Sequence, residues 1–411
     1  MANSLTAASP QYWSKNAEKK FYKTTFFQAI ANFSEEANVT DDGRIIDRPY
    51  RSSVIAENYT KGTALTAQDL TYTEDLLTID QQYSLLMYVD KIDKIQNKYN
   101  TVRLWSEEAG RRLGVKADSK VLYEVYNASS DIDASDLGGT AAEGISVSAS
   151  NVYQIFGEIN EQLDVLNVPQ EERYLVISPM FKNKLWQYIQ GKESMLGDRT
   201  GETGNIGTFA GLKLYLSTNL PNAARWTPAD NPTTAATITI EAITFTFVDS
   251  IGTTAGNILQ TTDLATTLDQ TVAFINGGGL ETATDCTAAT CQSLSTANQR
   301  IVQNWVAYDG TTYLEVRVKG SASNALTLTS SESSDTWDTK YQNHAMLAGR
   351  KGAIDVAIQT KGEMGIIDVE MASTVSTGKL GTNVMPLLLM GVKTFYTGKD
   401  ELVKVLVRAD S

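Results

Sequence analysis

A long stretch without basic residues is the feature that most constrains the folding of this chain. Between Trp226 and Gln299 there is no Lys or Arg, and residues 225–340 together hold 12 acidic and 5 basic residues among many Thr, Ala and Ser. The segments on either side have an ordinary mixture of charges. Because 411 residues are too many for one simple core, we expect residues 225–340 to be a self-contained unit inserted into another domain.

Within residues 225–340 the apolar pattern predicts mainly strands. ATITIEAITFTFVDS alternates with a period of two, as the strands of a hairpin do. A second hairpin is indicated around Asp309-Gly310, because Asp-Gly between two apolar runs is a strong turn signal. DLATTLDQTVAFING predicts a helix that ends at Gly277, and ALTLTSS predicts one more strand. The insert is therefore expected to be β-rich.

The chain before the insert begins with an arm and a hairpin. Residues 1–42 mix aromatic and charged side chains, which indicates an extended arm with a short helix near 16–33. Residues 43–89 hold strand-like stretches around the polar tip TKGTALTAQD, with a further turn at Asp80-Gln81-Gln82. A two-stranded hairpin is marginally stable alone in water, so it needs a surface to pack against. Apolar residues at helical spacing in 91–127 then predict a long helix.

Residues 150–221 alternate between helix and strand, which is typical of an α/β domain. A helix is predicted over 150–168 with Ser150 as its N-cap. RYLVISP predicts a buried strand, FKNKLWQYIQ a helix, and AGLKLYLSTNLP a second strand. After the insert, HAMLAGRKGAIDVAIQ predicts a helix with a structural histidine, His344, at its start, and residues 365–375 and 391–408 predict strands.

Residues that common kinds of catalysis require are scarce. The chain has one histidine, His344, whereas catalytic triads depend on a placed histidine and zinc sites need more His or Cys. The Gly-rich runs INGGGLE and GDRTGETGNIGTFAG lack the phosphate-loop pattern. In the acidic loop SSDIDASDLGG, Asp131 and Asp133 match calcium-ligand positions, but Asp136 stands where Gly is required and Ala142 where Glu is required. We expect no enzyme activity, no cofactor and no metal.

The distribution of charge leaves two interpretations of the N-terminal arm. The formal net charge of -13 disfavours a protein that covers nucleic acid with a basic face. Four lysines nevertheless gather in the arm, Lys15, Lys19, Lys20 and Lys23. They form either a solvated helix face or a contact with enclosed nucleic acid or another acidic partner.

The location of the chain follows from what its sequence does not contain. It has no run of about 18 apolar residues, as a membrane span requires, and its N-terminus lacks the pattern of a signal peptide. We therefore expect the protein to stay in the cytoplasm where it is made. In that reducing setting, Cys286 and Cys291 in the Thr-rich loop TDCTAATCQ are predicted to be two free thiols rather than a short local disulfide.

The order of arm, hairpin, long helix, α/β core, β-rich insert and return to the core resembles the major capsid proteins of tailed bacteriophages, which have the HK97-like fold. LTIDQQYSLLMYVDKIDKIQNKYN (77–100) resembles the segment that leads from their extended hairpin into the spine helix. RYLVISPMFKNKLWQ (173–187) is similar to their core strand and following helix, NIGTFAGLKLYLSTNLP (205–221) to an apical-domain strand, and MGVKTFYTGKDELVKVLV (390–407) to their closing strand.

The resemblance implies an α+β chain with a defined order of parts. These are an N-terminal arm (1–42), an extended hairpin loop (43–89), the spine helix with part of a peripheral domain (90–149), a first part of an apical domain (150–224), the β-rich insertion domain (225–340), and a return to the peripheral and apical core (341–411). Within the return, residues from 379 onward are expected in the apical domain.

The resemblance also implies a function. It predicts a structural subunit that self-assembles, as hexamers and pentamers, into an icosahedral shell around a double-stranded DNA genome. Its partners would be itself, scaffolding and portal proteins, and the packaged DNA through non-specific contacts, and it would be assembled in the cytoplasm of a host bacterium. Two alternatives stay open: an encapsulin-like compartment shell, and a surface or tail protein that binds a receptor through its insert.

One branch of the resembled family crosslinks a Lys of the extended loop to an Asn of the next subunit with help from a Glu. Lys61 is the one Lys in residues 44–80 and lies at the predicted tip of the hairpin. Asn383 and Glu363 are available late in the chain. We name the three as candidates only, because chance placement explains their positions equally well.

Overall fold

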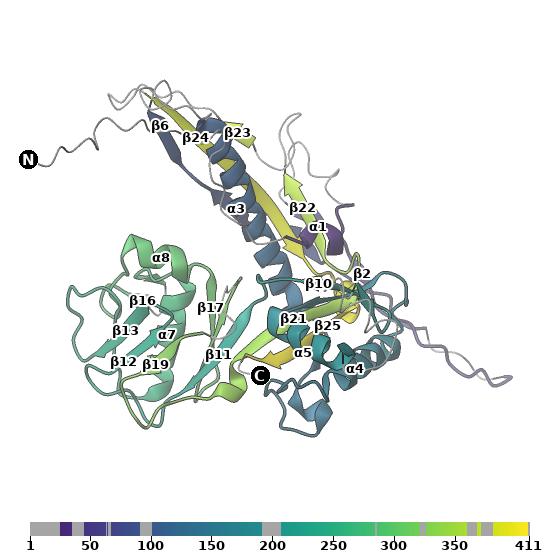
Figure 1. Cartoon of the computed structure of the whole chain (residues 1–411). Helices are drawn as coiled ribbons and strands as arrows, with labels where there is room; N and C mark the ends of the chain where they lie inside the picture. Colours follow the sequence, from purple (N-terminus) through teal and green to yellow (C-terminus); the bar gives the residue numbers. More distant parts are fainter. Residues whose placement is uncertain are drawn as a thin grey trace, which may run out of the picture.

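The computed structural model describes residues 25–34, 45–62, 64, 67–90, 101–190, 207–283, 286–320, 326–359, 368–370 and 381–409. Figure 1 shows three parts: a sheet with flanking helices, an insert packed beside one end of that sheet, and a long arm of helix and strand. A narrow hairpin leaves the molecule on the side opposite the insert. The four arm lysines, Glu363 and the run GDRTGETGNI lie outside the described residues. No helix in the described ranges has the length and hydropathy to cross a bilayer.

A ten-stranded sheet is the centre of the molecule. Its main order is β17-β18-β11-β21-β8-β10-β9, and β25, β7 and β20 pair at its sides. Strands β8 and β10 are parallel, and helix α5 connects them, as the predicted α/β pattern requires. The bounds are β7 Ser130–Ile132, β8 Arg173–Ile177, β9 Thr208–Phe209, β10 Leu212–Leu216, β11 Asn222–Thr227, β17 Trp305–Asp309, β18 Leu314–Val318, β20 Thr336–Trp337, β21 Asn343–Arg350, β25 Leu402–Arg408 and α5 Pro179–Gln190.

The helix predicted for HAMLAGRKGAIDVAIQ (344–359) is wrong. Residues 343–350 form strand β21, which pairs with β11, β8 and β25, and residues 355–359 form strand β22 (Asp355–Gln359). Seven of the eight residues of β21 are buried, so both faces of the strand are apolar and the alternation that marks a strand is lost. His344 is a buried strand residue opposite Asn222, not the first residue of a helix.

The helix predicted over 150–168 is α4 (Val152–Val165), and one apolar face of it is buried in the main core, made by Val152, Ile155, Phe156, Ile159 and Leu163. Its start differs from the expectation, because Asn151 and not Ser150 occupies the N-cap position. The Asn151 Oδ1 accepts the Ser148 amide at 2.8 Å, while the Ser150 hydroxyl bonds to Ser148 Oγ. In α5 the side chains of Phe181, Leu185 and Ile189 are buried, whereas Trp186 is exposed.

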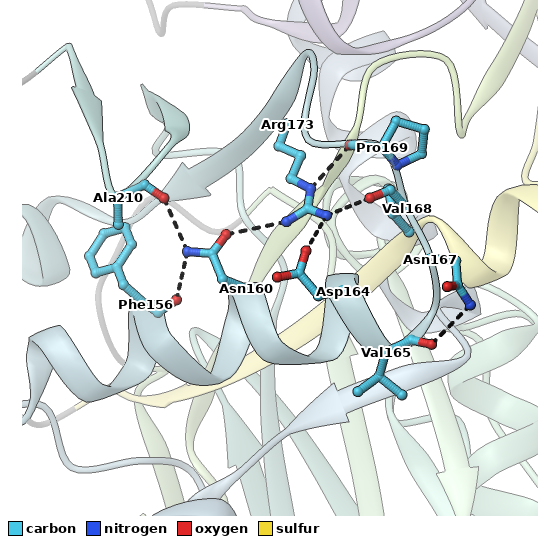
Figure 2. A network of polar contacts seen from close by, with 9 residues as sticks. All are labelled: Phe156, Asn160, Asp164, Val165, Asn167, Val168, Pro169, Arg173 and Ala210. Carbon is cyan, nitrogen blue, oxygen red and sulfur yellow. Dashed lines mark hydrogen bonds and ion pairs between the residues drawn. The ribbon is translucent and has the colours of Figure 1, made fainter.

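Arg173 joins the end of α4 to the beginning of β8 (Figure 2). Its guanidinium is almost fully buried and donates to the carbonyls of Pro169 and Val168 and, at 2.6 Å, to Asp164 Oδ1. Asn160 accepts another guanidinium N–H and donates to the Ala210 carbonyl, which extends the network to the β9–β10 turn. A buried charge is tolerated here because each of its neighbours is an oxygen acceptor.

The long arm combines helix α3 (Thr101–Tyr123) with a five-stranded sheet. Strand β24 (Gly381–Lys393) is the longest and pairs with β22, β23 (Asp368–Glu370), β5 (Gln81–Ser84) and β6 (Met87–Asp90). Helix α3 contacts β24, β5 and β6, so it covers one face of this sheet (Figure 1). The short helix α1 (Phe27–Ile30) packs against α3.

Two expectations about this region need correction. Gln81 and Gln82 belong to strand β5, so no turn spans 80–82, and the chain changes partner strand there instead. Residues 381–393 pair with the sheet of the long arm, whereas β25 alone of the segment from 379 onward joins the ten-stranded sheet. The expected start of the apical part at residue 379 is therefore wrong. Helix α9 (Tyr396–Asp400) connects the two sheets.

The insert has a core of its own. A four-stranded sheet of order β14-β13-β12-β19 packs with helix α7, and their buried side chains join those of β11, β17 and β18 in an apolar cluster separate from the main core. The predicted hairpins, the helix ending at Gly277 and the last strand are all confirmed. The bounds are β12 Thr237–Ile240, β13 Ile243–Val248, β14 Asn257–Leu259, α7 Leu264–Asn276, β15 Thr282–Ala283, β16 Cys286–Thr287, α8 Thr296–Val302 and β19 Leu328–Ser330.

The insert is less self-contained than its composition suggests. The hairpin β17–β18 extends the ten-stranded sheet, because β18 pairs with β11 from Asn222↔Val318 to Trp226↔Leu314. The two cysteines also differ in the structure from the two free thiols predicted for a reducing cytoplasm. Cys286 and Cys291 form a disulfide, and both side chains are fully buried in the core of the insert.

The Arg173 network predicts a clear difference between two substitutions. Arg173→Ala leaves the buried Val168 carbonyl and the partly buried Pro169 carbonyl without their donor, and we expect it to lower the free energy of unfolding by roughly 2–4 kcal/mol. Asp164→Ala removes a half-exposed partner and should cost at most about 1 kcal/mol. Urea denaturation of both variants followed by circular dichroism measures this, and equal losses would contradict the buried network.

Candidate assembly surfaces

The hairpin that projects from the molecule carries the largest group of exposed apolar side chains. Strands β1 (Ile45–Asp47) and β4 (Leu76–Thr78) pair at its base, and β2 (Tyr50–Arg51) and β3 (Tyr72–Thr73) continue the ribbon outward. Farther out, the side chain of Gln68 bonds to both the amide and the carbonyl of Ile55. Along this ribbon Ile55 is 75% exposed and Leu70 and Tyr72 are each 72% exposed.

We call the exposed apolar side chains Val54, Ile55, Tyr59, Leu70 and Tyr72 the hairpin patch. A narrow ribbon has no core of its own, so these side chains have no place to be buried within the same hairpin. Large exposed apolar side chains gathered on one projecting element mark a candidate site of protein–protein contact. The hairpin patch is therefore the first candidate assembly surface.

The base of the hairpin is fixed by a second set of contacts. The guanidinium of Arg48 pairs with buried Asp355 at 3.2 Å and lies 4.4 Å from the ring centroid of Phe395. Tyr50 stacks on Tyr396, with ring centroids 4.2 Å apart and planes 3° from parallel. Asp355 begins β22, and Phe395 and Tyr396 follow the end of β24. Contacts with these residues therefore fix the direction in which the hairpin leaves the body.

Asp75 adds a third contact at the base of the hairpin. Its carboxylate pairs with Lys393 at 3.1 Å and accepts the Tyr396 amide at 2.8 Å. The ribbon is thus held by charge pairs and stacked rings at its base, while its apolar side chains lie farther out. Such an arrangement suits a projecting contact element, since little conformational freedom is lost when it binds.

A smaller apolar surface lies on the sheet of the long arm. Tyr83 and Leu388 are opposite each other and pack inward with the main core, where burial raises the pKa of Tyr83 to about 12. The alternate residues Leu86, Tyr88 and Leu387 are exposed. Since successive residues of a strand point to opposite faces, these three lie on the face away from the core.

The crosslinking candidates fall on separate elements. Lys61 is exposed in the turn at the tip of the hairpin, beside Gly62, whose φ of +92° suits glycine. Asn383 lies in β24 opposite Tyr88 of β6. Glu363 and the lysines Lys15, Lys19, Lys20 and Lys23 lie outside the described residues, so these candidates remain predictions.

The acidic loop uses its carboxylates internally. Asp133 accepts the amides of Ser135 and Ala142, and these bonds lower its pKa although burial opposes them. Asp136 accepts the Asp133 amide at 2.8 Å, and Asp131 pairs with Lys404. Within the described part of the chain no group of three or more His, Cys, Asp or Glu side chains could hold a metal ion.

Sequence reasoning missed the seam that joins the insert to helix α3. The guanidinium of Arg317 in β18 lies between the rings of Tyr126 and Tyr308, 3.9 and 4.1 Å from their centroids. The Tyr123 hydroxyl is 3.2 Å from that of Tyr308, and the ammonium of Lys319 lies 4.8 Å from the centroid of Tyr123. Cations over tyrosine faces at these distances are attractive contacts.

Positive charge accumulates at this seam. Burial, and after it the nearby charge of Lys120, lowers the pKa of Lys319 to about 8. Burial also lowers the pKa of Lys116, which donates to Asn304 of the insert. Holding the Lys319 ammonium at neutral pH therefore costs free energy, and the stacked contacts of Arg317 must offset that cost.

This charge predicts a pH dependence. An unfolded lysine has a pKa of about 10.4, so between about pH 8 and about pH 10 the unfolded chain binds more protons at Lys319 than the folded chain does. The contribution of Lys319 to stability therefore rises with pH in that window and is lowest below it. Lys319→Met should raise the unfolding temperature at pH 7 by a few degrees, and the gain should disappear near pH 10.

Thermal unfolding of both proteins at several pH values measures this gain. Lys351→Met, at an exposed position, is the matched control and should follow the wild-type profile. A gain for Lys319→Met that does not change with pH would show that the ammonium is not the cause.

This chain resembles known proteins in its fold but not in its sequence. No family model matches the chain, and no curated protein resembles it in sequence. Among solved structures, it is similar to a chain of Mycobacterium phage Che8, with 14% identity over 96% of both chains and a TM-score of 0.56. The capsid of cyanophage P-SCSP1u gives 13% identity over 99% of this chain and 95% of the other, with a TM-score of 0.54.

A third structure is similar over nearly the same length. The mature capsid of bacteriophage PhiM1 matches at 10% identity over 97% of this chain and 92% of the other, with a TM-score of 0.51. In all three comparisons the match covers at least 96% of this chain. The fold of this chain is therefore the HK97-like α+β fold of the tailed-phage major capsid proteins.

Proposed function

We propose that this chain is the structural subunit of an icosahedral phage capsid, which self-assembles and encloses a genome. The observation that carries the proposal is the hairpin patch: five large apolar side chains on a ribbon that projects from the body and cannot bury them. The capsid structures of the same fold support the class of assembly.

The physics of a shell agrees with this surface. Each subunit of a closed shell must contact several copies of itself, and each contact needs only modest strength because it is repeated many times. Burial of one exposed Ile, Leu or Val side chain contributes roughly 1.5–3 kcal/mol. The hairpin patch therefore supplies enough apolar surface for such a contact, and the clamped base directs it to one place on the neighbour.

The remaining parts of the proposal concern partners. A scaffolding protein and a portal protein are proposed to direct assembly in the host cytoplasm, and the finished location is the virion capsid. The lysines Lys15, Lys19, Lys20 and Lys23 are proposed to contact packaged DNA through their charge alone. The role is proposed to be structural and not enzymatic. A covalent link between Lys61 and Asn383 of the next subunit is a separate part of the proposal, with its own test.

Assembly is tested by expressing the full chain alone and together with its neighbouring genes. Electron microscopy of negatively stained samples should show closed shells, tubes or sheets of uniform thickness. A monomer or small oligomer in both samples would overturn the proposal and favour a receptor-binding role for the insert. A reduced, boiled denaturing gel of assembled particles should show a ladder only if the proposed crosslink forms.

The hairpin patch can be tested separately from folding. Ile55→Asp and Leu70→Asp each place a charge in the proposed contact and should abolish shells, because burial of an unpaired carboxylate costs several kcal/mol at each repeated contact. Both residues are exposed in the single chain, so circular dichroism and unfolding temperature should stay close to those of the wild type.

The matched control is Ile301→Asp, which places the same charge at an exposed apolar position on α8 of the insert. It should leave assembly unchanged if the hairpin patch is the contact. If the two hairpin variants assemble as well as this control does, the hairpin patch is not an assembly surface.

A further inference from the structure

The two cysteines occupy a strand end and a turn in the core of the insert. Cys286 lies in β16, and Cys291 follows the turn 287–290. Their Cα atoms are 5.5 Å apart, a separation common in disulfides, and both side chains are fully buried. They are the only cysteines of the chain, so all of its thiol chemistry is concentrated at this point.

The backbone brings the two sulfurs together without help from the bond between them. The Thr290 and Cys291 amides both donate to the Thr287 carbonyl at 2.8 Å, and the Thr287 amide donates to Thr290 Oγ1 at 2.8 Å. These hydrogen bonds close the turn between the cysteines. The reduced chain can therefore keep the same geometry, which holds one thiol beside the other.

This turn is attached to the outer strand of the insert sheet. Cys286 pairs with Ala283 in the β15–β16 ribbon, and Cys291 bridges Ile258 of β14. The Leu259 amide donates to the Thr290 carbonyl at 2.7 Å, and the Gln292 amide donates to the Asn257 carbonyl at 2.9 Å. Strand β14 is at the end of the four-stranded sheet, so the cysteine turn covers an edge that would otherwise be unpaired.

We propose that Cys286 and Cys291 form a redox-dependent clasp on the insert, open as two thiols while the protein is in a reducing cytoplasm and closed as a disulfide once it is exposed to an oxidising medium. The oxidant is a low-molecular-weight disulfide. A cysteine thiolate attacks one of its sulfurs and releases the first small thiol. The second cysteine then attacks the mixed disulfide and releases the second small thiol, so two protein thiols are oxidised as one small disulfide is reduced.

The closed clasp restrains the edge of the insert. Opening of β14 requires the turn to separate from the β15–β16 ribbon, and the bond ties the two ends of that turn together. Burial of both sulfurs also shields the bond from reductant, because exchange needs an attacking thiolate to reach a sulfur. The same burial slows the approach of the oxidant, so the clasp should close and reopen slowly under native conditions.

The redox state is read by trapping thiols in the full-length protein, assembled or not. Cells are lysed directly into acid, and the protein is denatured and alkylated with N-ethylmaleimide before intact-mass measurement. Material from the reducing cytoplasm should carry two alkyl groups. Native protein treated with glutathione disulfide should carry no alkyl group. Its mass should be that of the unmodified, reduced chain less two hydrogen atoms. Two free thiols after that treatment would overturn the proposal, as would a disulfide already formed in the cytoplasm.

The effect on the insert is read by hydrogen exchange of the same two samples. Closing the clasp should slow exchange at the Leu259, Cys291 and Gln292 amides by about tenfold or more, while amides of β8 in the main sheet stay unchanged. Cys286→Ala/Cys291→Ala is the control and should show no difference between the two treatments. Equal exchange in oxidised and reduced wild type would show that the bond forms but restrains nothing. These results do not depend on shell formation, so the clasp and the proposed function fail separately.

Discussion

The pairing of β11 with β21 is the constraint on which the rest of this molecule depends. Asn222 lies opposite His344 and Ala223 opposite Asn343, so the strand that leads into the insert and the strand that follows it are neighbours in the main sheet. An excursion of any length between the two strands is then compatible with the sheet, because its ends are already side by side. For this reason the main sheet can accommodate the insert without losing the packing of its core.

Close packing around β21 shows how strictly this junction is built. Gly144 lies so near that a side-chain carbon at its position would meet Asn343 and come within 3.1 Å of the Arg408 amide. The Gly144 amide donates to the Lys340 carbonyl, and that of Ile145 to the Leu406 carbonyl, each at 2.9 Å. Residues 144–145, which precede α4, therefore pack against both the end of the insert and strand β25.

Helix α3 provides the common reference for the other parts. Buried Asp118 accepts the amides of Phe26 and Phe27 and an N–H of Asn219, which ties the start of α1 and the approach to β11 to one side chain. Near its end, Arg317 of the insert lies between tyrosines of this segment and of β17. The arm, the sheet and the insert are thus positioned against one helix, while the hairpin is clamped to the strands that the helix covers.

The sequence by itself determined the elements whose patterns are local. Residues of α4, α7 and the β12–β13 and β17–β18 hairpins have periodicities or turn signals that depend only on near neighbours, and each formed as predicted. The exposed apolar hairpin could also be anticipated, because no two-stranded ribbon can bury its own side chains.

Tertiary structure alone decided the parts whose partners are distant in the chain. Strand β21 has no alternating pattern because it is covered on both faces, and its run Ala-Met-Leu-Ala (345–348) is equally compatible with a helix. The Arg317 seam depends on which strands and helices meet, and such meetings leave no mark in the spacing of residues. Local periodicity reports which side of an element is apolar, whereas the neighbour that covers this side is chosen only when the whole chain packs.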